Sequence, residues 1–343
     1  MDIANRLKLS RATVSRALNG ENVSEKTKQM VLAEAEKLGY IPNVAATALA
    51  QKNDKLIYAF IIATIDEGYG EDTYNGIIDA INLWQGYHLK VEIVFTDINL
   101  KGNQAKTQIE QFKNVLQNKQ VDGVIFSALS QENMDYVSRE CLARKIPLMT
   151  LDMIYKDPSL CHAGPEYFEL GTYTAAYLAS LMRKEGRLLI LYYDEGYDLS
   201  KERMRGFFHK LKEYPNIEKK VVTIENTSSK IYNQKLEKYF FEYNPRAIYA
   251  PYRAEHIGSF LKRNKLGGKV NLISTGINKK VEEYLYDGTI DGIVSTKPYF
   301  LGAFIMNNFF KYFYRSKEVL RGNIDVSCDI YIKEIYKRYD KIF

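Results

Sequence analysis

The pattern of apolar and polar positions changes character near residue 55. Before it, apolar residues recur every three or four positions within 3–7, 14–18 and 31–38, which is typical of small amphipathic helices. After it, short apolar runs alternate with helical periods, which predicts parallel, doubly wound sheets with helices between the strands. The runs that we expect to be strands are 56–62, 91–96, 123–127, 148–151, 188–193, 221–224, 247–250, 272–275 and 293–296.

The region after residue 55 is long for a single sheet. It holds about 290 residues, so we expect two lobes, because chains of this length split their hydrophobic core. The predicted organisation is an all-α domain at 1–42, a hinge helix and linker at 43–55, and a bilobed α/β domain at 56–343. We expect lobe 1 at about 56–160 and 291–322, and lobe 2 at about 161–290 and 323–343.

The first two predicted helices have the layout of a DNA-reading helix-turn-helix. Ser10 can cap the second helix, and Asn19-Gly20 can end it; Ser24 can cap a third. With Val14 and Ala17 buried, the opposite face presents hydrogen-bonding groups and one small apolar contact, which suits the major-groove edges of bases. This face holds Arg11, Ala12, Ser15, Arg16 and Asn19.

The distribution of charge favours this interpretation over an ordinary solvated helix face. The chain carries a net charge of +6, and its first 20 residues hold four Lys or Arg against one Asp or Glu. Half of the net charge therefore lies beside the proposed reading helix. Clustered positive charge is the electrostatic pattern expected of a domain that contacts phosphates.

Residues 43–50 predict a helix that forms only conditionally. Asn43 can cap about two helical turns, which is shorter than the roughly 12 residues that a lone helix needs in water. The segment has small side chains and one leucine, Leu49, near its end. A pair of such helices fits a minor groove, where leucines wedge between base steps.

Several motifs together resemble the lactose-repressor (LacI/GalR) family of bacterial transcription regulators. They are DIA at 2–4, LSRATVSRALNG at 9–20, VS at 23–24 and LGY-x-PN at 38–43, followed by Leu49. The resemblance implies base-reading roles for Arg11, Ala12 and Arg16 and an intercalating role for Leu49. It also implies DNA contacts by Ser10, Thr13, Ser15, Asn43 and Ala46.

Two features depart from the family pattern. Lys8 stands where the turn usually has a glycine, so either Lys8 takes a left-handed conformation or the turn differs. The chain begins at Met1-Asp2 without the few residues that normally precede the first helix, which leaves open a native start further upstream.

The sequence has neither a signal-like segment at its start nor an apolar run approaching the roughly 18 residues of a membrane span. We therefore expect a cytoplasmic protein without a membrane partner, unlike the exported sugar-binding proteins that share the bilobed fold. Cys141, Cys161 and Cys328 are far apart, and we expect buried thiols. No cofactor or metal is expected.

In a doubly wound sheet the ligand crevice lies outside the carboxyl ends of the strands. A carboxylate, an arginine and aromatic rings there suit a polyhydroxylated ring. The candidates are Asp66, Tyr69, Ser127, Asp152, Arg203, Tyr252, Arg253, Asn278 and Thr296. By the resemblance, Asp152 and Arg203 match the sugar-binding pattern.

Other positions depart from the family's sugar-binding pattern. Tyr252-Arg253 replaces Asn-Asp, Gly276 replaces an aspartate, and Thr296 replaces a frequent glutamine. Arg203, Arg253 and Lys297 could together hold a phosphorylated or carboxylated ligand. The alternative is that Arg253 and Lys297 face solvent.

These observations predict a homodimeric transcription regulator, a repressor, that binds a near-palindromic double-stranded operator and responds to a small, carbohydrate-derived effector. The alternatives are control by a protein partner or by a purine-like corepressor. An enzyme is disfavoured, because H-E-x-x-H, G-x-S-x-G and a complete phosphate loop are missing from the sequence. The identity of the effector and the choice between induction and corepression stay open.

Overall fold

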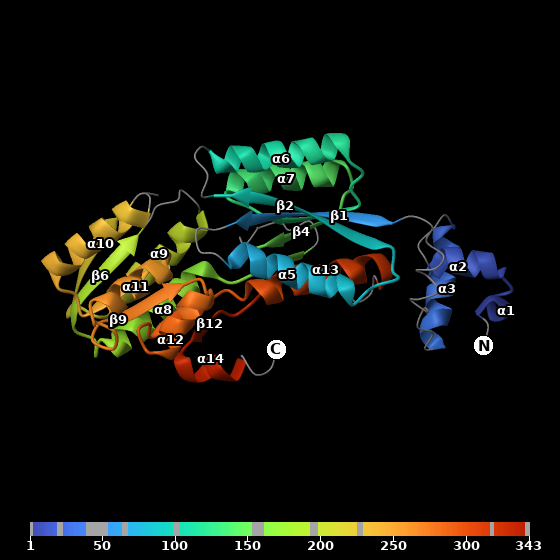
Figure 1. Ribbon diagram of the computed structural model, residues 1–343. Coiled ribbons are helices and arrows are strands. Elements are labelled where there is room, and N and C mark those ends of the chain that lie inside the picture. The colour runs from blue at the N-terminus through green and yellow to red at the C-terminus, as the bar shows by residue number, and fades with distance from the viewer. Residues whose placement is uncertain are drawn as a thin grey trace.

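The computed structural model describes residues 3–18, 23–38, 54–63, 68–98, 103–152, 161–192, 198–224, 229–315 and 319–339. These residues form a small helical domain at the N-terminal end of the chain and two α/β lobes that follow it (Figure 1). Among them, no helix has the length and apolar character needed to cross a bilayer.

The helical domain consists of α1 (Ile3–Leu7), α2 (Arg11–Leu18) and α3 (Glu25–Lys37). The three helices bury a common core that includes Ile3, Val14 and Val31. The predicted caps are confirmed, because the Ser10 hydroxyl accepts a hydrogen bond from the Thr13 N–H at 3.0 Å and Ser24 caps α3 in the same way. Lys8 adopts the left-handed conformation at φ 53°, so the turn keeps its geometry without glycine.

Lobe 1 contains a parallel sheet of six strands in the order β11-β5-β4-β3-β1-β2. Helices α5 and α13 cover one face and α6 and α7 the other (Figure 1). Ile57 and Ile61 pack under α13, whereas Phe60 packs against Phe112 of α6, so alternate residues of β1 fill the two cores. The bounds are β1 Lys55–Ala63, α5 Tyr69–Asn82, β2 Leu89–Asp97, α6 Gln104–Asn118, β3 Gly123–Ser127, α7 Gln131–Ala143, β4 Leu148–Leu151, β5 Cys161–Gly164, α13 Pro298–Tyr314 and β11 Gly322–Asp325.

Lobe 2 repeats this architecture with strands in the order β12-β10-β9-β8-β6-β7, in which only β12 runs antiparallel to its neighbour. Helices α8 and α9 pack on one face, and α10, α11 and α12 pack on the other. The bounds are α8 Tyr167–Leu181, β6 Gly186–Tyr192, α9 Asp198–Leu211, β7 Ile217–Thr223, α10 Ser229–Tyr243, β8 Ala247–Ala250, α11 Ala254–Arg263, β9 Asn271–Thr275, α12 Lys279–Tyr286, β10 Gly292–Ser295, β12 Asp329–Tyr331 and α14 Lys333–Tyr339.

The chain crosses between the lobes later than the sequence predicts. β5 lies in the first sheet although we expected lobe 2 to begin at 161, and β10 lies in the second sheet although we expected lobe 1 to resume at 291. β11 also extends past the expected crossing at 322. The crossings in the structure therefore lie a few residues beyond the predicted positions near 160, 290 and 322. At the first and last of these, β5 and β11 are too short to show a strand pattern in the sequence.

The three cysteines are free thiols. Cys141 and Cys161 are buried, as predicted, whereas Cys328 is half-buried beside the last crossing between the lobes.

Candidate functional site

The predicted DNA-reading face lies on α2 and is open to solvent. Arg11, Ala12, Ser15 and Arg16 are exposed, whereas Val14 and Ala17 on the opposite side are buried in the helical core. Thr13 is half-buried and its hydroxyl lies 2.8 Å from the Ser10 hydroxyl. Four further predicted DNA contacts fall outside the described residues, namely Asn19, Asn43, Ala46 and Leu49.

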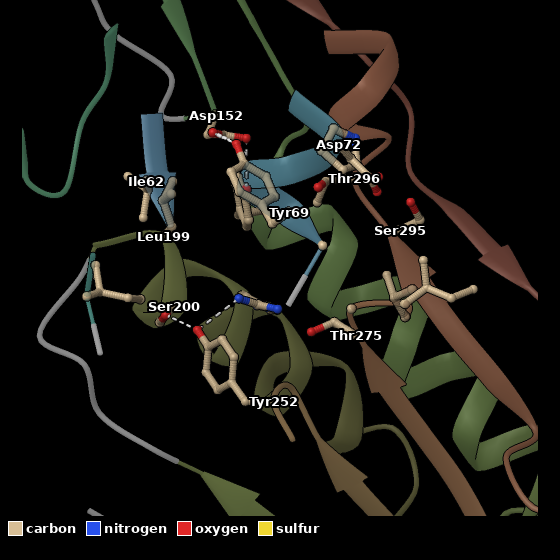
Figure 2. Close-up of a pocket in the computed structure, with 18 of the residues that line it drawn as sticks. Ile62, Tyr69, Asp72, Asp152, Leu199, Ser200, Tyr252, Thr275, Ser295 and Thr296 are labelled. Atoms are coloured by element: carbon tan, nitrogen blue, oxygen red, sulfur yellow. Dashed lines mark hydrogen bonds between the residues drawn. The ribbon is translucent and has the colours of Figure 1, made fainter. Parts of the chain in front are cut away.

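A cavity of about 130 Å³ lies between the two lobes (Figure 2). Pockets for drug-sized ligands typically measure about 300–1,000 Å³, so this cavity suits a smaller molecule. Lobe 1 contributes Ile62, Tyr69, Asp72 and Asp152 to its lining, and lobe 2 contributes Leu199, Ser200, Arg203, Tyr252 and Thr275. Ser295 and Thr296 come from the chain that crosses between the lobes after β10.

Asp152 directly follows β4 and is almost fully buried at 1% exposure. Its carboxylate accepts a hydrogen bond from the hydroxyl of Tyr69 (Figure 2). It also accepts from Ser127 Oγ at 2.8 Å and from the Tyr167 hydroxyl at 3.5 Å. Burial raises the pKa of Asp152 to about 7, and the hydrogen bond from Tyr167 opposes this rise. The protein itself therefore supplies three hydrogen-bond donors to the carboxylate that the sequence predicts to contact a ligand.

Arg203 lies in the second turn of α9 and is 7% exposed. Its guanidinium donates to the Tyr252 hydroxyl at 3.1 Å, and Ser200 Oγ lies 2.5 Å from the same hydroxyl (Figure 2). The guanidinium also lies 5.3 Å from the centre of the Tyr252 ring and 5.9 Å from that of Tyr167, close enough for cation–π attraction. Tyrosines from α8 and from the loop after β8 thus hold this cation at the cavity wall.

Two glycines allow α8 and α9 to approach closely enough to place these groups. A Cβ at Gly171 would lie 1.9 Å from the Arg203 carbonyl oxygen, and one at Gly206 would lie 1.9 Å from the Phe168 carbonyl oxygen. Any larger residue must push the helices apart. The two glycines therefore set the position of the backbone that carries Arg203.

Asp72 is a lining residue that the sequence analysis missed. It lies in the first turn of α5 and is half-buried. Burial raises its pKa to about 6, and the negative charges of Glu71 and of Glu282 in lobe 2 add to the rise. The signal was its spacing, because Asp72 follows Tyr69 by three residues and so shares its helix face.

The structure brings only some of the predicted ligand residues together. Tyr69, Asp152, Arg203, Tyr252 and Thr296 line the cavity. Ser127 lies behind Asp152, to which it donates, and Asp66 falls outside the described residues. Tyr167, Ser200 and Ser295 also line the site, although the sequence analysis did not select them.

Three side chains that the sequence suggested for the ligand, those of Arg253, Asn278 and Lys297, do not line this cavity. Arg253 precedes α11 with a left-handed backbone, and its guanidinium lies 4.9 Å from the centre of the Tyr232 ring. Asn278 caps α12, and Lys297 pairs with Asp329 at 3.1 Å. None of the three lines the cavity, so the predicted trio of cations does not form there, and Arg203 is the only Lys or Arg among the described lining residues.

Comparison with known families agrees with this architecture. Residues 58–313 match the family described as periplasmic binding protein domain, and residues 1–43 match the bacterial regulatory proteins of the lacI family. The chain belongs to the periplasmic binding protein domain family, and its first 43 residues are similar to the lacI family of regulators. Both parts of the predicted fold class, the helix-turn-helix domain and the bilobed domain, are confirmed.

Curated relatives of this chain include two catabolite control proteins A. The protein from Staphylococcus xylosus is 33% identical over 141 residues, which is 40% of each chain. The protein from Priestia megaterium is 31% identical over 164 residues, 44% of this chain and 46% of the relative. The chain thus matches about half the length of these relatives or less.

Solved structures share the bilobed fold at low sequence identity. A proposed LacI transcriptional regulator from Bacteroides fragilis superposes with a TM-score of 0.76 at 17% identity, over 84% of this chain and 100% of that chain. A solute-binding protein from Burkholderia graminis in complex with D-arabinose gives a TM-score of 0.72 at 17% identity, over 84% and 99% of the two chains.

Proposed function

We propose that this protein is a sequence-specific DNA-binding transcriptional repressor whose operator affinity is controlled by a small ligand held between its lobes. The observation that carries the proposal is the combination of an exposed polar face on α2 with a cavity between two lobes of one chain. One part can contact base edges, and the other can convert ligand binding into a change in the arrangement of the lobes.

The DNA-binding role rests on Arg11 and Arg16. Both are exposed on the face of α2 opposite its buried residues, so both can enter a major groove without disturbing the core. We propose that the protein acts in the cytoplasm as a homodimer. Two copies are needed because the two short hinge helices at 43–50 would brace each other over the centre of a near-palindromic site.

The ligand-binding role rests on the lining of the cavity. Tyrosine rings, hydroxyl groups, carboxyl groups and one arginine can cover and hydrogen-bond a small polyhydroxylated ring. The neighbouring fold in complex with D-arabinose supports a ligand of monosaccharide size. A protein partner as the controlling agent receives less support, because the lobes leave room for a small molecule between them.

A binding-site selection with the full chain tests the DNA-binding role. Arg16→Ala should weaken operator binding by about 1–3 kcal/mol and relax the preference at one position of the site. Lys26→Ala, which removes an exposed charge from the first turn of α3, is the matched control and should change affinity modestly without altering the motif. An unchanged motif at full affinity with Arg16→Ala would refute the proposed reading face.

A further inference from the structure

The two sides of the cavity differ in charge. Arg203 enters from lobe 2, and Asp72 and Asp152 enter from lobe 1. Since Arg253 and Lys297 lie elsewhere, the described lining contains two carboxyl groups and a single cation. This balance does not favour a phosphorylated or carboxylated ligand, which would meet one arginine and two acidic groups.

The two carboxyl groups differ in what surrounds them. Asp152 receives hydrogen bonds from Tyr69, Ser127 and Tyr167, so its oxygens already have partners. The carboxylate of Asp72 forms no hydrogen bond or ion pair with any residue that the structure describes. A half-buried carboxylate without a counter-charge is costly, and a bound cation removes that cost.

The position of Asp72 places it at the junction of the lobes. It lies one turn into α5, whose start approaches lobe 2 so closely that a Cβ at Gly68 would lie 2.7 Å from the Ile277 carbonyl oxygen. Glu282 of α12 adds negative potential from the lobe 2 side. A positive group bound at Asp72 therefore experiences attraction from both lobes.

The aromatic lining suits the same kind of group. Tyr69 lies on the cavity wall beside Asp152, with Tyr252 on the far side of the cavity (Figure 2). Tyr167 also lines the cavity and donates to Asp152. Tyrosine faces attract ammonium groups, and tyrosine hydroxyls can hydrogen-bond sugar hydroxyls. The volume of about 130 Å³ limits the ligand to roughly one sugar ring.

We propose that the interlobe cavity binds an amino sugar, a monosaccharide whose ammonium group pairs with Asp72 while its ring lies among the cavity tyrosines. This inference rests on the proposed function, because it names the ligand class of the same cavity. An ammonium held by Asp72 on lobe 1 and hydroxyls held near Arg203 on lobe 2 would join the lobes through one molecule.

A competing explanation for Asp72 is stabilisation of α5. Acidic residues in the first turn of a helix interact favourably with its dipole, and Glu71 and Asp72 both occupy that turn. Glu71 differs in being exposed, so it serves as a matched control. If Asp72 serves only the helix dipole, substitutions at Asp72 and at Glu71 should have equal effects on ligand binding. If Asp72 binds the ligand, only the substitution at Asp72 should weaken ligand binding.

Calorimetric titration of the full chain tests the proposal. The probes are D-glucosamine, D-galactosamine and D-mannosamine, each compared with its neutral parent hexose and its N-acetyl derivative, together with D-glucuronate and D-galacturonate. We expect at least one amino sugar to bind about tenfold more tightly than both of its neutral counterparts and than either uronate. The proposal is overturned if all three amino sugars bind no better than their parents, or if a uronate binds more tightly.

The variants then assign the effect to Asp72. Asp72→Asn should abolish the tenfold preference for the amine, Asp72→Glu should retain part of it, and Glu71→Gln should leave it within twofold of wild type. Far-UV circular dichroism confirms that each variant is folded. Full preference in Asp72→Asn, or equal losses in Asp72→Asn and Glu71→Gln, would contradict the proposal. The binding-site selection is independent of these titrations, so failure of the amino-sugar inference is distinguishable from failure of the proposed DNA-binding function.

Discussion

Replacing Asp152 by asparagine should remove the pH dependence that this buried carboxyl imposes on lobe 1. Burial raises its pKa from 3.8 to about 7, so the folded protein binds this proton more tightly than the unfolded chain does. Stability from this group is therefore greatest at low pH and falls as the pH rises from about 4 to about 7.

The magnitude follows from the width of the pH interval. One pKa unit corresponds to about 1.4 kcal/mol, and the slope flattens near the folded pKa of about 7, so wild-type lobe 1 should lose about 2 kcal/mol between pH 5 and pH 7 through Asp152 alone. The asparagine side chain of the Asp152→Asn variant does not titrate. Between pH 5 and pH 8 the variant should therefore gain about 3 kcal/mol in free energy of unfolding relative to wild type. Asp72 and the other titrating groups are present in both proteins and cancel in this difference.

The only tryptophan offers a probe in the same lobe. Trp84 follows α5 and stacks on Phe310 of α13 with ring centres 3.7 Å apart, so its fluorescence should follow the unfolding of lobe 1. Urea titrations of both proteins at pH 5 and at pH 8 give the difference in free energy of unfolding between variant and wild type at each pH. If this difference between variant and wild type is the same at both pH values, the raised pKa of Asp152 is refuted. A wild type that gains stability with rising pH, relative to the variant, would show that the three hydroxyl donors outweigh burial.

Three other outcomes follow from the same geometry. Arg203→Ala should abolish binding of a cavity ligand, whereas Arg253→Ala should leave binding intact, because the Arg253 side chain lies over Tyr232 outside the cavity. A calorimetric titration that shows loss of binding in both variants would contradict this. Leu49→Ala should preserve folding but reduce DNA bending in a gel-mobility assay, and equal bending by mutant and parent would remove the proposed wedge. Gly171→Ala should lower the stability of lobe 2 by about 1–3 kcal/mol, because the added Cβ would collide with the Arg203 carbonyl oxygen. A Tm within about one degree of wild type would show that α8 and α9 are not held this closely.

The sequence predicted best those elements whose local pattern agrees with their environment. Strands 123–127, 148–151 and 247–250 have the predicted bounds, because each is a short, fully buried apolar run. Ser10 and Ser24 were predictable as caps because capping depends on neighbours in the chain. β5, β11 and β12 were not predictable, because strands of three or four mixed residues are defined by the partner beside them.

The candidate site followed the same division. The strand-end rule found Asp152, whose backbone directly follows β4, and the resemblance found Arg203. The rule failed for Arg253 and Lys297, because each has a left-handed backbone immediately before a helix and its side chain packs against a tertiary neighbour. The strand-end rule did not select Asp72, because this residue lies on a helix and its place in the cavity depends on how closely the two lobes approach.

The central claim, that one chain couples a ligand between its lobes to operator binding, is tested most directly by fluorescence anisotropy with the selected operator. The full chain is titrated with and without saturating amounts of whichever sugar binds most tightly by calorimetry. We predict that the ligand changes operator affinity at least about fivefold in wild type. Arg203→Ala should retain the ligand-free affinity and show no ligand effect. Identical operator affinity with and without a sugar that demonstrably occupies the cavity of the wild-type protein would contradict the account.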